Sequence, residues 1–276
     1  MTLPRRSPVS APGRLIGHRT LWWPRKKFIK RLRLSFQWAA SITSHEWYIY
    51  TSAIEAMRAA GVRFLLGGGF ALAAYTGRWR DTKDIDFYIM PEARQAAVAC
   101  LSKAGFADYY SRVAYDRKWI HRNVRSDMIV DLIWAMANQR TRVDSLWFER
   151  AQTVSIRGRQ LGVIPIEEML WCKLYIMQRD HCDWTDIFNL LYARGKQIDW
   201  THLLHRLDGD LPLLKAMLGV YGWLCPAESR RLPIWRRLGM PLPENAPSFI
   251  SRERMSLLDS RAWFAARLPR NEKLEV

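Results

Sequence analysis

The sequence predicts an α/β (α+β) protein in which a core with a mixed β-sheet precedes a mainly helical C-terminal region. Three observations lead to this prediction. Short apolar runs alternate with helical patterns between residues 46 and 164, in an order that suits a mixed sheet. After Pro165 the apolar residues recur at helical spacing to about residue 222. The 276 residues are 49% apolar and 12% aromatic, which is typical of a globular chain.

The predicted core elements are separated by glycines, prolines and polar residues. In order they are a helix over 46–60, a strand RFLL that ends in a glycine turn, a helix beginning with FALAAY, a strand over 84–89, a helix from Pro91 to about Lys103, strands over 117–122 and 127–134, and a hairpin around Gly158. Beyond Pro165, the helical pattern is interrupted near Gly195 and Gly209.

The chain divides into three predicted parts. Residues 1–45 are a basic N-terminal extension that we expect to be flexible, residues 46–164 form the core, and residues 165–276 form a helical C-terminal domain. The first 40 residues contain ten Lys or Arg and no acidic residue. A transit peptide is the alternative interpretation of this extension.

The overall charge indicates the class of partner. The formal net charge of +17 favours polyanions such as nucleic acid, nucleotides or an anionic membrane surface. No apolar run reaches 18 residues, so we expect no membrane span. The four cysteines include no CxxC pair, and this predicts reduced thiols and a cytoplasmic location rather than a disulfide scaffold or a zinc site.

Two aspartates share one face of the predicted strand over 84–89. Side chains two positions apart on a strand point the same way, so Asp84 and Asp86 lie side by side. Neighbouring carboxylates repel and raise each other's pKa, and a cation between them removes this cost. Mg²⁺ suits such a pair because it takes hard oxygen ligands and keeps positions open for phosphate. The alternative is a solvated polar face of the strand.

A third aspartate lies in MIVDLIW, a strand that is apolar on both faces and is therefore expected to be central and buried. A buried carboxylate without a partner costs several kcal/mol. Asp131 therefore needs either a metal ion or an Arg or Lys. Asp127, nearer the start of the strand, is the second candidate for the third carboxylate.

Three glycines follow the RFLL strand directly. Gly67, Gly68 and Gly69 let backbone N–H groups approach a ligand closely, and a helix begins behind them, which suits a triphosphate. Together with three carboxylates that hold two Mg²⁺ ions, this set suits in-line attack on an α-phosphorus.

These residues resemble the nucleotidyltransferase superfamily that includes DNA polymerase beta, aminoglycoside nucleotidyltransferases and type IV toxin nucleotidyltransferases. The family pattern is an apolar residue, Gly and Gly or Ser, a helix, Asp-apolar-Asp, and a later Asp on another strand. In FLLGGGFALAAYTGRWRDTKDIDFYI and MIVDLIW, these positions are Gly67, Gly68, Asp84, Asp86 and Asp131. The link Arg80-x-Thr82 before Asp84 is similar to that of the small bacterial branch.

The resemblance extends over about residues 46–225. IPIEEMLWCKLYIMQRDHCDWTDIFNLL looks like the second-domain helix of that branch, with matches at Lys173, Arg179, Asp183 and Asp186. Cys182 stands where the family often has Lys. Lys173 is either a phosphate contact or a lysine on a helix surface, and the two aspartates are expected to pair with Arg179 or Arg194.

The resemblance implies an activity and a role for each residue. Asp84 and Asp86 would ligate two Mg²⁺ ions, and Asp131 would ligate the ion that activates the acceptor and would receive its proton. The predicted nucleotide-binding residues are Gly67, Gly68, Gly69, Arg80, Thr82 and Lys173. The expected reaction moves a nucleoside monophosphate from an NTP to a hydroxyl of RNA, protein or a small molecule and releases pyrophosphate. The charge favours RNA.

A different class of function fits the same features. A non-catalytic nucleotide- or nucleic-acid-binding protein on this fold would also carry a basic tail. Mg²⁺-dependent label transfer from an α-labelled NTP separates an enzyme from a binding protein.

Overall fold

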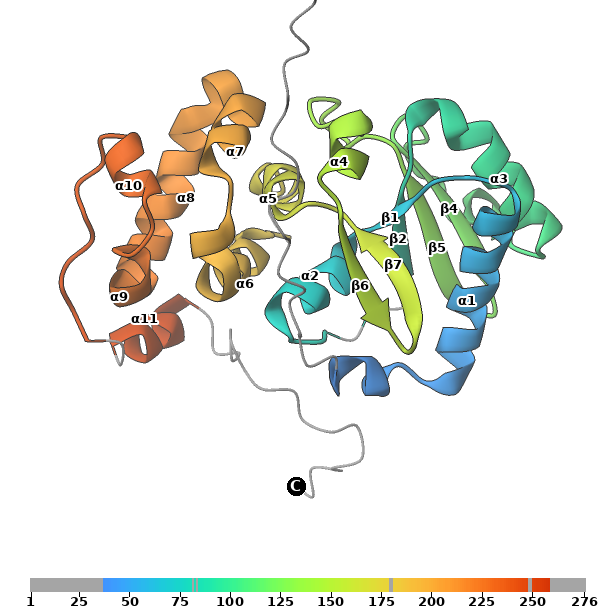
Figure 1. Ribbon diagram of the computed structural model, residues 1–276, viewed down its shortest axis with the longest axis horizontal. Coiled ribbons are helices and arrows are strands. Elements are labelled where there is room, and N and C mark those ends of the chain that lie inside the picture. Colours follow the sequence, from blue (N-terminus) through green and yellow to red (C-terminus); the bar gives the residue numbers. More distant parts are fainter. Residues whose placement is uncertain (1–36, 81, 83, 179–180, 248–249, 259–276) are drawn as a thin grey trace, which may run out of the picture. The chain divides into compact units, whose positions relative to one another are not determined.

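One mixed β-sheet organises the N-terminal half of the described chain. The computed structural model describes residues 37–80, 82, 84–178, 181–247 and 250–258 (Figure 1). Within them, seven strands pair in the order β3-β4-β5-β2-β1-β7-β6. The strands are β1 (Leu65–Leu66), β2 (Asp84–Tyr88), β3 (Ala107–Asp108), β4 (Ile120–Arg125), β5 (Met128–Ile133), β6 (Gln152–Ile156) and β7 (Arg159–Val163). β2 is parallel to β5 and β1 to β7, whereas the other neighbours are antiparallel, so the predicted fold class is confirmed.

Helices pack on the sheet and then dominate the chain after β7. The α-helices are α1 (Ser44–Ala59), α2 (Gly68–Thr76), α3 (Arg94–Lys103), α4 (Ser145–Glu149), α5 (Ile166–Leu174), α6 (Trp184–Arg194), α7 (Trp200–Leu207), α8 (Leu211–Leu224), α9 (Pro226–Ser229), α10 (Ile234–Arg237) and α11 (Ile250–Leu258). Short 3₁₀ helices are η1 (Gln37–Ser41), η2 (Pro91–Ala93), η3 (Tyr109–Ser111), η4 (Gly195–Gln197) and η5 (Asp208–Asp210). α1 and α3 both contact β5, and Figure 1 shows α2 on the other side of the sheet.

Local sequence signals explain where the helices next to the sheet begin and end. Thr43 and Glu46 form a capping box at the start of α1, so two backbone N–H groups that lack helical partners are satisfied. α2 ends at Gly77, whose φ of 73° is in the left-handed region that glycine adopts without strain. These signals agree with the helix predicted over 46–60 and the one predicted from FALAAY.

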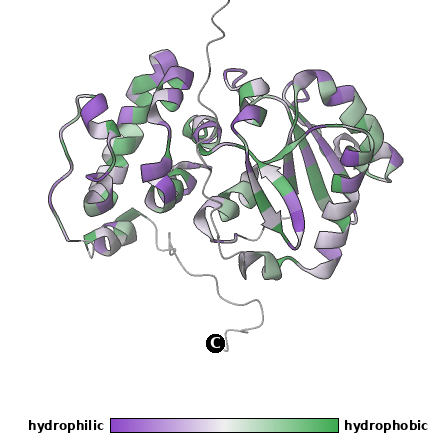
Figure 2. Ribbon diagram, in the orientation of Figure 1, coloured by the Kyte–Doolittle hydropathy of each residue, from purple (hydrophilic) through white to green (hydrophobic). Residues whose placement is uncertain are grey.

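β5 is the central strand that the sequence predicts. It lies between β4 and β2, and apolar residues run along these strands (Figure 2). Asp131, on β5, is 1% exposed. The expectation of a buried carboxylate in a strand that is apolar on both faces is therefore confirmed.

Two predicted boundaries differ from the structure. β4 spans 120–125 rather than 117–122, because the chain turns back through Ser126 and Asp127, which both have positive φ. The helical stretch after Pro165 also breaks between α5 and α6, where Met177 and Cys182 form an antiparallel bridge. The hairpin around Gly158 is present as β6 and β7.

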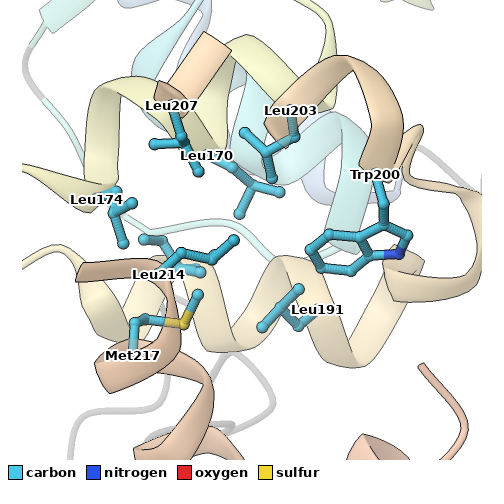
Figure 3. A pocket seen from close by; sticks show the side chains of 9 residues that line it. Leu170, Leu174, Leu191, Trp200, Leu203, Leu207, Leu214 and Met217 are labelled. Atoms are coloured by element: carbon cyan, nitrogen blue, oxygen red, sulfur yellow. The ribbon is translucent and has the colours of Figure 1, made fainter. Parts of the chain in front are cut away.

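The helices after β7 pack around apolar side chains of their own. Every residue of α5 is buried, which is typical of a helix covered on all sides. A cavity of about 10 Å³ remains between α5, α6, α7 and α8. Figure 3 shows the side chains that surround it: Leu170, Leu174, Leu191, Trp200, Leu203, Leu207, Leu214 and Met217. It has room for about one water molecule and no polar group to hold it, so this is a packing defect rather than a ligand site.

Most of the predicted N-terminal extension, residues 1–36, lies outside the described residues. The described remainder packs on the core, since Trp38 is buried and stacks on Trp79 with ring centroids 5.2 Å apart. All described residues belong to one unit that spans Leu34–Val276. The proposed boundary between a core over 46–164 and a helical domain over 165–276 stays a prediction. In the described part of the chain, every helix is too short or too polar to cross a membrane.

Candidate active site

The three predicted carboxylates lie on two adjacent parallel strands. Asp84 and Asp86 are on β2, and Asp86 is the register partner of Asp131 on β5. Neighbouring strands are about 4.8 Å apart, and side chains in register point to the same face of a sheet. The structure therefore brings the side chains of Asp84, Asp86 and Asp131 to one face, as the sequence predicts.

A cleft of about 280 Å³ opens over this face of the sheet. Every predicted site residue except Gly67 lines it: Gly68, Gly69, Arg80, Thr82, Asp84, Asp86, Asp131 and Lys173. Gly67 adjoins the cleft, because its backbone N–H donates to the carbonyl oxygen of Asp86 at 3.0 Å. Residues from the sheet and from α5 thus form one site.

Close packing explains why the turn before α2 consists of glycines. A Cβ atom on Gly67 would overlap the ring of Tyr88, and one on Gly68 would overlap Oδ2 of Asp86. Gly68 also has a φ of 45°, in the left-handed region. The first turn of α2 therefore lies directly against the carboxylate of Asp86, and its free backbone N–H groups are near the cleft.

We expect Gly68→Ala to lower the free energy of unfolding by about 1–3 kcal/mol and to weaken NTP binding, because the methyl group displaces the Asp86 carboxylate. Urea unfolding and nucleotide titration measure the two effects. Gly61→Ala is the matched control: its φ of 65° gives similar backbone strain, but open space surrounds it. Equal effects of the two substitutions would show that the contact with Asp86 is unimportant.

The carboxylate of Asp86 has no direct partner among the described residues. It is half-buried, lines the cleft, and makes no hydrogen bond or ion pair with any described side chain or backbone group. Burial, followed by the charges of Asp84 and Asp131, raises its pKa well above the ordinary value for aspartate. Asp84 is engaged locally, since the Thr82 hydroxyl donates to Oδ1 of Asp84 and the Asp84 backbone N–H donates to Thr82 Oγ1 at 3.4 Å. Crowded negative charge is thus the main electrostatic feature of the cleft.

Asp131 is compensated by an arginine. Nε of Arg122 donates to Oδ1 and Oδ2 of Asp131 at 3.1 and 3.2 Å, and Nη2 of Arg122 donates to Oδ2 at 2.9 Å. Burial raises the pKa of Asp131 to about 6, although the bonds from Arg122 act in the opposite direction. Of the two compensators that the sequence allows, metal or Arg/Lys, the structure contains the arginine.

This pairing affects the expected metal site. Among the residues that the structure describes, no three His, Cys, Asp or Glu side chains are arranged to hold a metal ion. The carboxylate of Asp131 is bound to Arg122 and that of Asp183 to Lys173, which leaves Asp84 and Asp86 as the cleft carboxylates with no ion pair to a described residue. Asp127, the alternative third carboxylate, is wrong for this role: it lies in the β4–β5 turn, is 89% exposed and pairs with Arg112 at 3.2 Å.

Lys173 belongs to a buried ion network. Its Nζ donates to Asp183 Oδ2 at 2.6 Å and to Asp186 Oδ2 at 2.8 Å. Burial lowers the pKa of Lys173, but Asp186 and Asp183 outweigh this effect and the net shift is upward. The alternative of a lysine on a helix surface is therefore wrong.

Arg80 and His181 extend this network to the protein surface. Nη1 of Arg80 donates to Asp186 at 3.2 Å, and Nε2 of His181 lies 2.8 Å from Asp183. The predicted pairing of the two aspartates with Arg194 is wrong, since Nε of Arg194 donates to the carbonyl oxygen of Tyr75. The other predicted partner, Arg179, lies outside the described residues.

Comparison with known proteins identifies the family of the chain. The model of a family described as "uncharacterised nucleotidyltransferase" matches residues 15–217. This match begins before the segment 46–225, over which the sequence motifs resemble nucleotidyltransferases, and ends slightly before the end of that segment. A search of curated proteins finds no match.

Several solved structures are similar over much of their own length. The antibiotic-resistance factor ANT(2'')-Ia has a TM-score of 0.45 at 17% identity, covering 64% of this chain and 97% of that one. The lincomycin-bound lincosamide antibiotic adenylyltransferase LnuA has a TM-score of 0.39 at 18% identity, covering 54% and 95%. JHP933 from Helicobacter pylori has a TM-score of 0.35 at 15% identity, covering 80% and 97%. Since the family model matches well over half of the sequence, the chain belongs to this family and is a nucleotidyltransferase.

Proposed function

We propose that this nucleotidyltransferase moves a nucleoside monophosphate from an NTP to a hydroxyl group, with release of pyrophosphate, and that it needs a divalent metal ion. One observation carries the proposal: the half-buried carboxylate of Asp86, which has no ion-pair partner among the described residues, lies beside Asp84 in a cleft, directly against the first turn of α2. This arrangement places negative ligands for a cation next to backbone donors for phosphate.

The residues of the cleft fit such an ion. Asp86 has no compensating partner in the described chain, and its raised pKa reflects burial and repulsion from Asp84. Asp84 and Asp86 would hold the ion, which would supply positive charge to the phosphates of the NTP. The carboxylate oxygens of these two residues are hard, anionic ligands, which Mg²⁺ and Mn²⁺ prefer.

Other residues of the cleft would hold the triphosphate. The free backbone N–H groups of Gly68 and Gly69 at the start of α2 suit a phosphate oxygen, and the helix dipole favours the negative charge. Arg80 has a side chain that is 58% exposed, and Asp186 is its ion-pair partner within the described ranges, so its other donors would be available to phosphate. Lys173 would act indirectly, because it fixes Asp186 and Asp186 in turn orients Arg80.

In the proposed reaction, Asp131 would take the proton of the acceptor hydroxyl. A carboxylate with a pKa of about 6 is ionised at neutral pH and is more basic than an ordinary aspartate. Arg122 would fix its orientation, as the third member of a catalytic set orients a base. As the acceptor oxygen attacks the α-phosphorus, its proton would move to an oxygen of Asp131.

The test is transfer of label from each of four α-labelled NTPs, with Mg²⁺ or Mn²⁺, to total RNA, proteins and small hydroxyl compounds. Asp84→Asn should abolish the transfer. Asp127→Asn is the matched control, because it changes an aspartate in the exposed β4–β5 turn, away from the cleft. Equal labelling by wild type and Asp84→Asn with every acceptor would refute the proposal and favour a non-catalytic binding protein.

RNA is the acceptor that the net charge of +17 favours. If the protein neutralises about four RNA phosphates on binding, its affinity for RNA should fall about 100-fold between roughly 50 and 200 mM salt. Fluorescence anisotropy with a labelled RNA at several salt concentrations measures this slope. A flat dependence would count against RNA and leave a protein hydroxyl or a small molecule as the acceptor.

A further inference from the structure

The pairing of Arg122 with Asp131 bears on the number of ions in the site. Both oxygens of the Asp131 carboxylate accept hydrogen bonds from one guanidinium, at 2.9–3.2 Å. The Asp131 side chain is 2% exposed, whereas that of Arg122 is 34% exposed and lines the cleft. The carboxylate therefore lies at the bottom of the cleft with little exposed surface, and its positive partner is more open to the space where substrate would bind.

The backbone fixes this pair in place. Arg122 and Asp131 are register partners on the antiparallel strands β4 and β5, and the tight turn through Ser126 and Asp127 sets that register. The backbone N–H of Arg122 also donates to the hydroxyl of Tyr115 at 2.8 Å. Because β5 lies between β4 and β2, the guanidinium comes from one side of Asp131 and the Asp84–Asp86 pair from the other.

Electrostatics opposes a second ion at the same carboxylate. A divalent cation bound to Asp131 would lie within a few ångströms of the Arg122 guanidinium, and at about 5 Å their repulsion is several kcal/mol even at an effective dielectric constant of 20. Asp131 already has the positive neighbour that a buried carboxylate needs.

We propose that Arg122 takes the place of a second divalent ion, so that the cleft binds one ion, at Asp84 and Asp86, instead of the two expected from the resemblance. The guanidinium neutralises Asp131 and presents a fixed positive charge to the phosphates on the side away from the ion. This inference rests on the proposed function, because it assumes that the Asp84–Asp86 pair binds a metal.

The experiment counts ions. Mn²⁺ is titrated into the metal-free, full-length protein, and the bound fraction is followed by the loss of the free Mn²⁺ signal in electron paramagnetic resonance. Wild type should bind one Mn²⁺ per chain. Arg122→Gln should bind a second ion at least roughly tenfold more tightly than wild type does, because the repelling charge is gone and Asp131 is released. Arg122→Lys keeps the charge and should stay at one ion.

Arg125→Gln is the control from the same strand. Arg125 donates to the carbonyl oxygen of Ala104 at 3.3 Å and is not part of the cleft lining, so this variant should bind one ion. Thermal unfolding gives a second measurement: Mn²⁺ should raise the midpoint of Arg122→Gln more than that of wild type, since the second ion replaces the lost partner of Asp131.

The outcomes are distinguishable. Two ions of similar affinity in wild type would overturn the inference and leave the proposed function intact. One ion in both wild type and folded Arg122→Gln would also overturn it. No bound ion in wild type would instead refute the metal dependence on which the proposed function stands. If Arg122→Gln fails to fold, the wild-type and Arg122→Lys counts still decide between one ion and two.

Discussion

Asp86→Asn should reduce nucleotidyl transfer by at least about 100-fold and, in the absence of metal, should raise the thermal stability of the protein. Asparagine keeps the shape of aspartate and removes its charge. In the cleft this relieves the repulsion from Asp84 and Asp131, which together with burial raises the pKa of Asp86. A gain of about 1 kcal/mol would raise the unfolding midpoint by roughly 2–4 °C in a domain of this size.

Calorimetry of metal-free protein, with and without added Mn²⁺, measures both sides of this prediction. Mn²⁺ should stabilise wild type, because an ion that binds the folded state shifts the unfolding equilibrium, and it should stabilise Asp86→Asn much less. Asp127→Asn should resemble wild type in activity and in its response to Mn²⁺. A variant at position 86 that keeps its activity, or that unfolds at a lower temperature than wild type without metal, would contradict the role given to Asp86.

Sequence patterns were sufficient to predict the carboxylates and the glycine turn because these depend on local periodicity. Alternation along 84–89 places Asp84 and Asp86 on one face, and the doubly apolar segment around Asp131 predicts a central strand. Because β2 and β5 are neighbouring strands, the three aspartates lie close together in the fold. The close approach of Gly68 to Asp86 also agrees with the expectation that this turn needs glycine.

Arg122 was missed because the register of one hairpin was not recognised. A strand predicted over 117–122 leaves Arg122 at its end, whereas a two-residue turn at Ser126–Asp127 places Arg122 opposite Asp131. The signal was present in the sequence, since aspartate adopts positive φ more readily than most residues and such turns join adjacent strands. A shift of a few residues in one boundary thus concealed the partner of the buried carboxylate.

The network around Lys173 depends on tertiary structure that local patterns do not contain. The helical periodicity after Pro165 does not show that the chain leaves the helix after Leu174, turns back through the bridge between Met177 and Cys182, and returns Asp183 to Lys173. Burial of α5 on all sides is likewise a property of its neighbours. A lysine in such a helix can be placed inside or outside only after the packing is known.

Lys173→Met should lower the free energy of unfolding by about 3–5 kcal/mol, since it removes the buried cation that the two enclosed carboxylates share and leaves them with the exposed side chains of Arg80 and His181. The Asp183 and Asp186 side chains are each 7% exposed, so water compensates them poorly. Urea unfolding of the full-length protein measures the loss. Arg80→Gln, which removes a 58% exposed partner of the same Asp186, should cost less than about 1 kcal/mol.

A triple variant separates a structural role of Lys173 from direct contact with phosphate. Adding Asp183→Asn and Asp186→Asn to Lys173→Met removes the stranded charges, so most of the lost stability should return. The triple variant should bind NTP more weakly than wild type only to the extent that Arg80 is no longer held by its ion pair with Asp186. If Lys173→Met instead unfolds like wild type but no longer binds NTP, the lysine contacts phosphate directly, and the two aspartates only hold it in place while the cleft is empty.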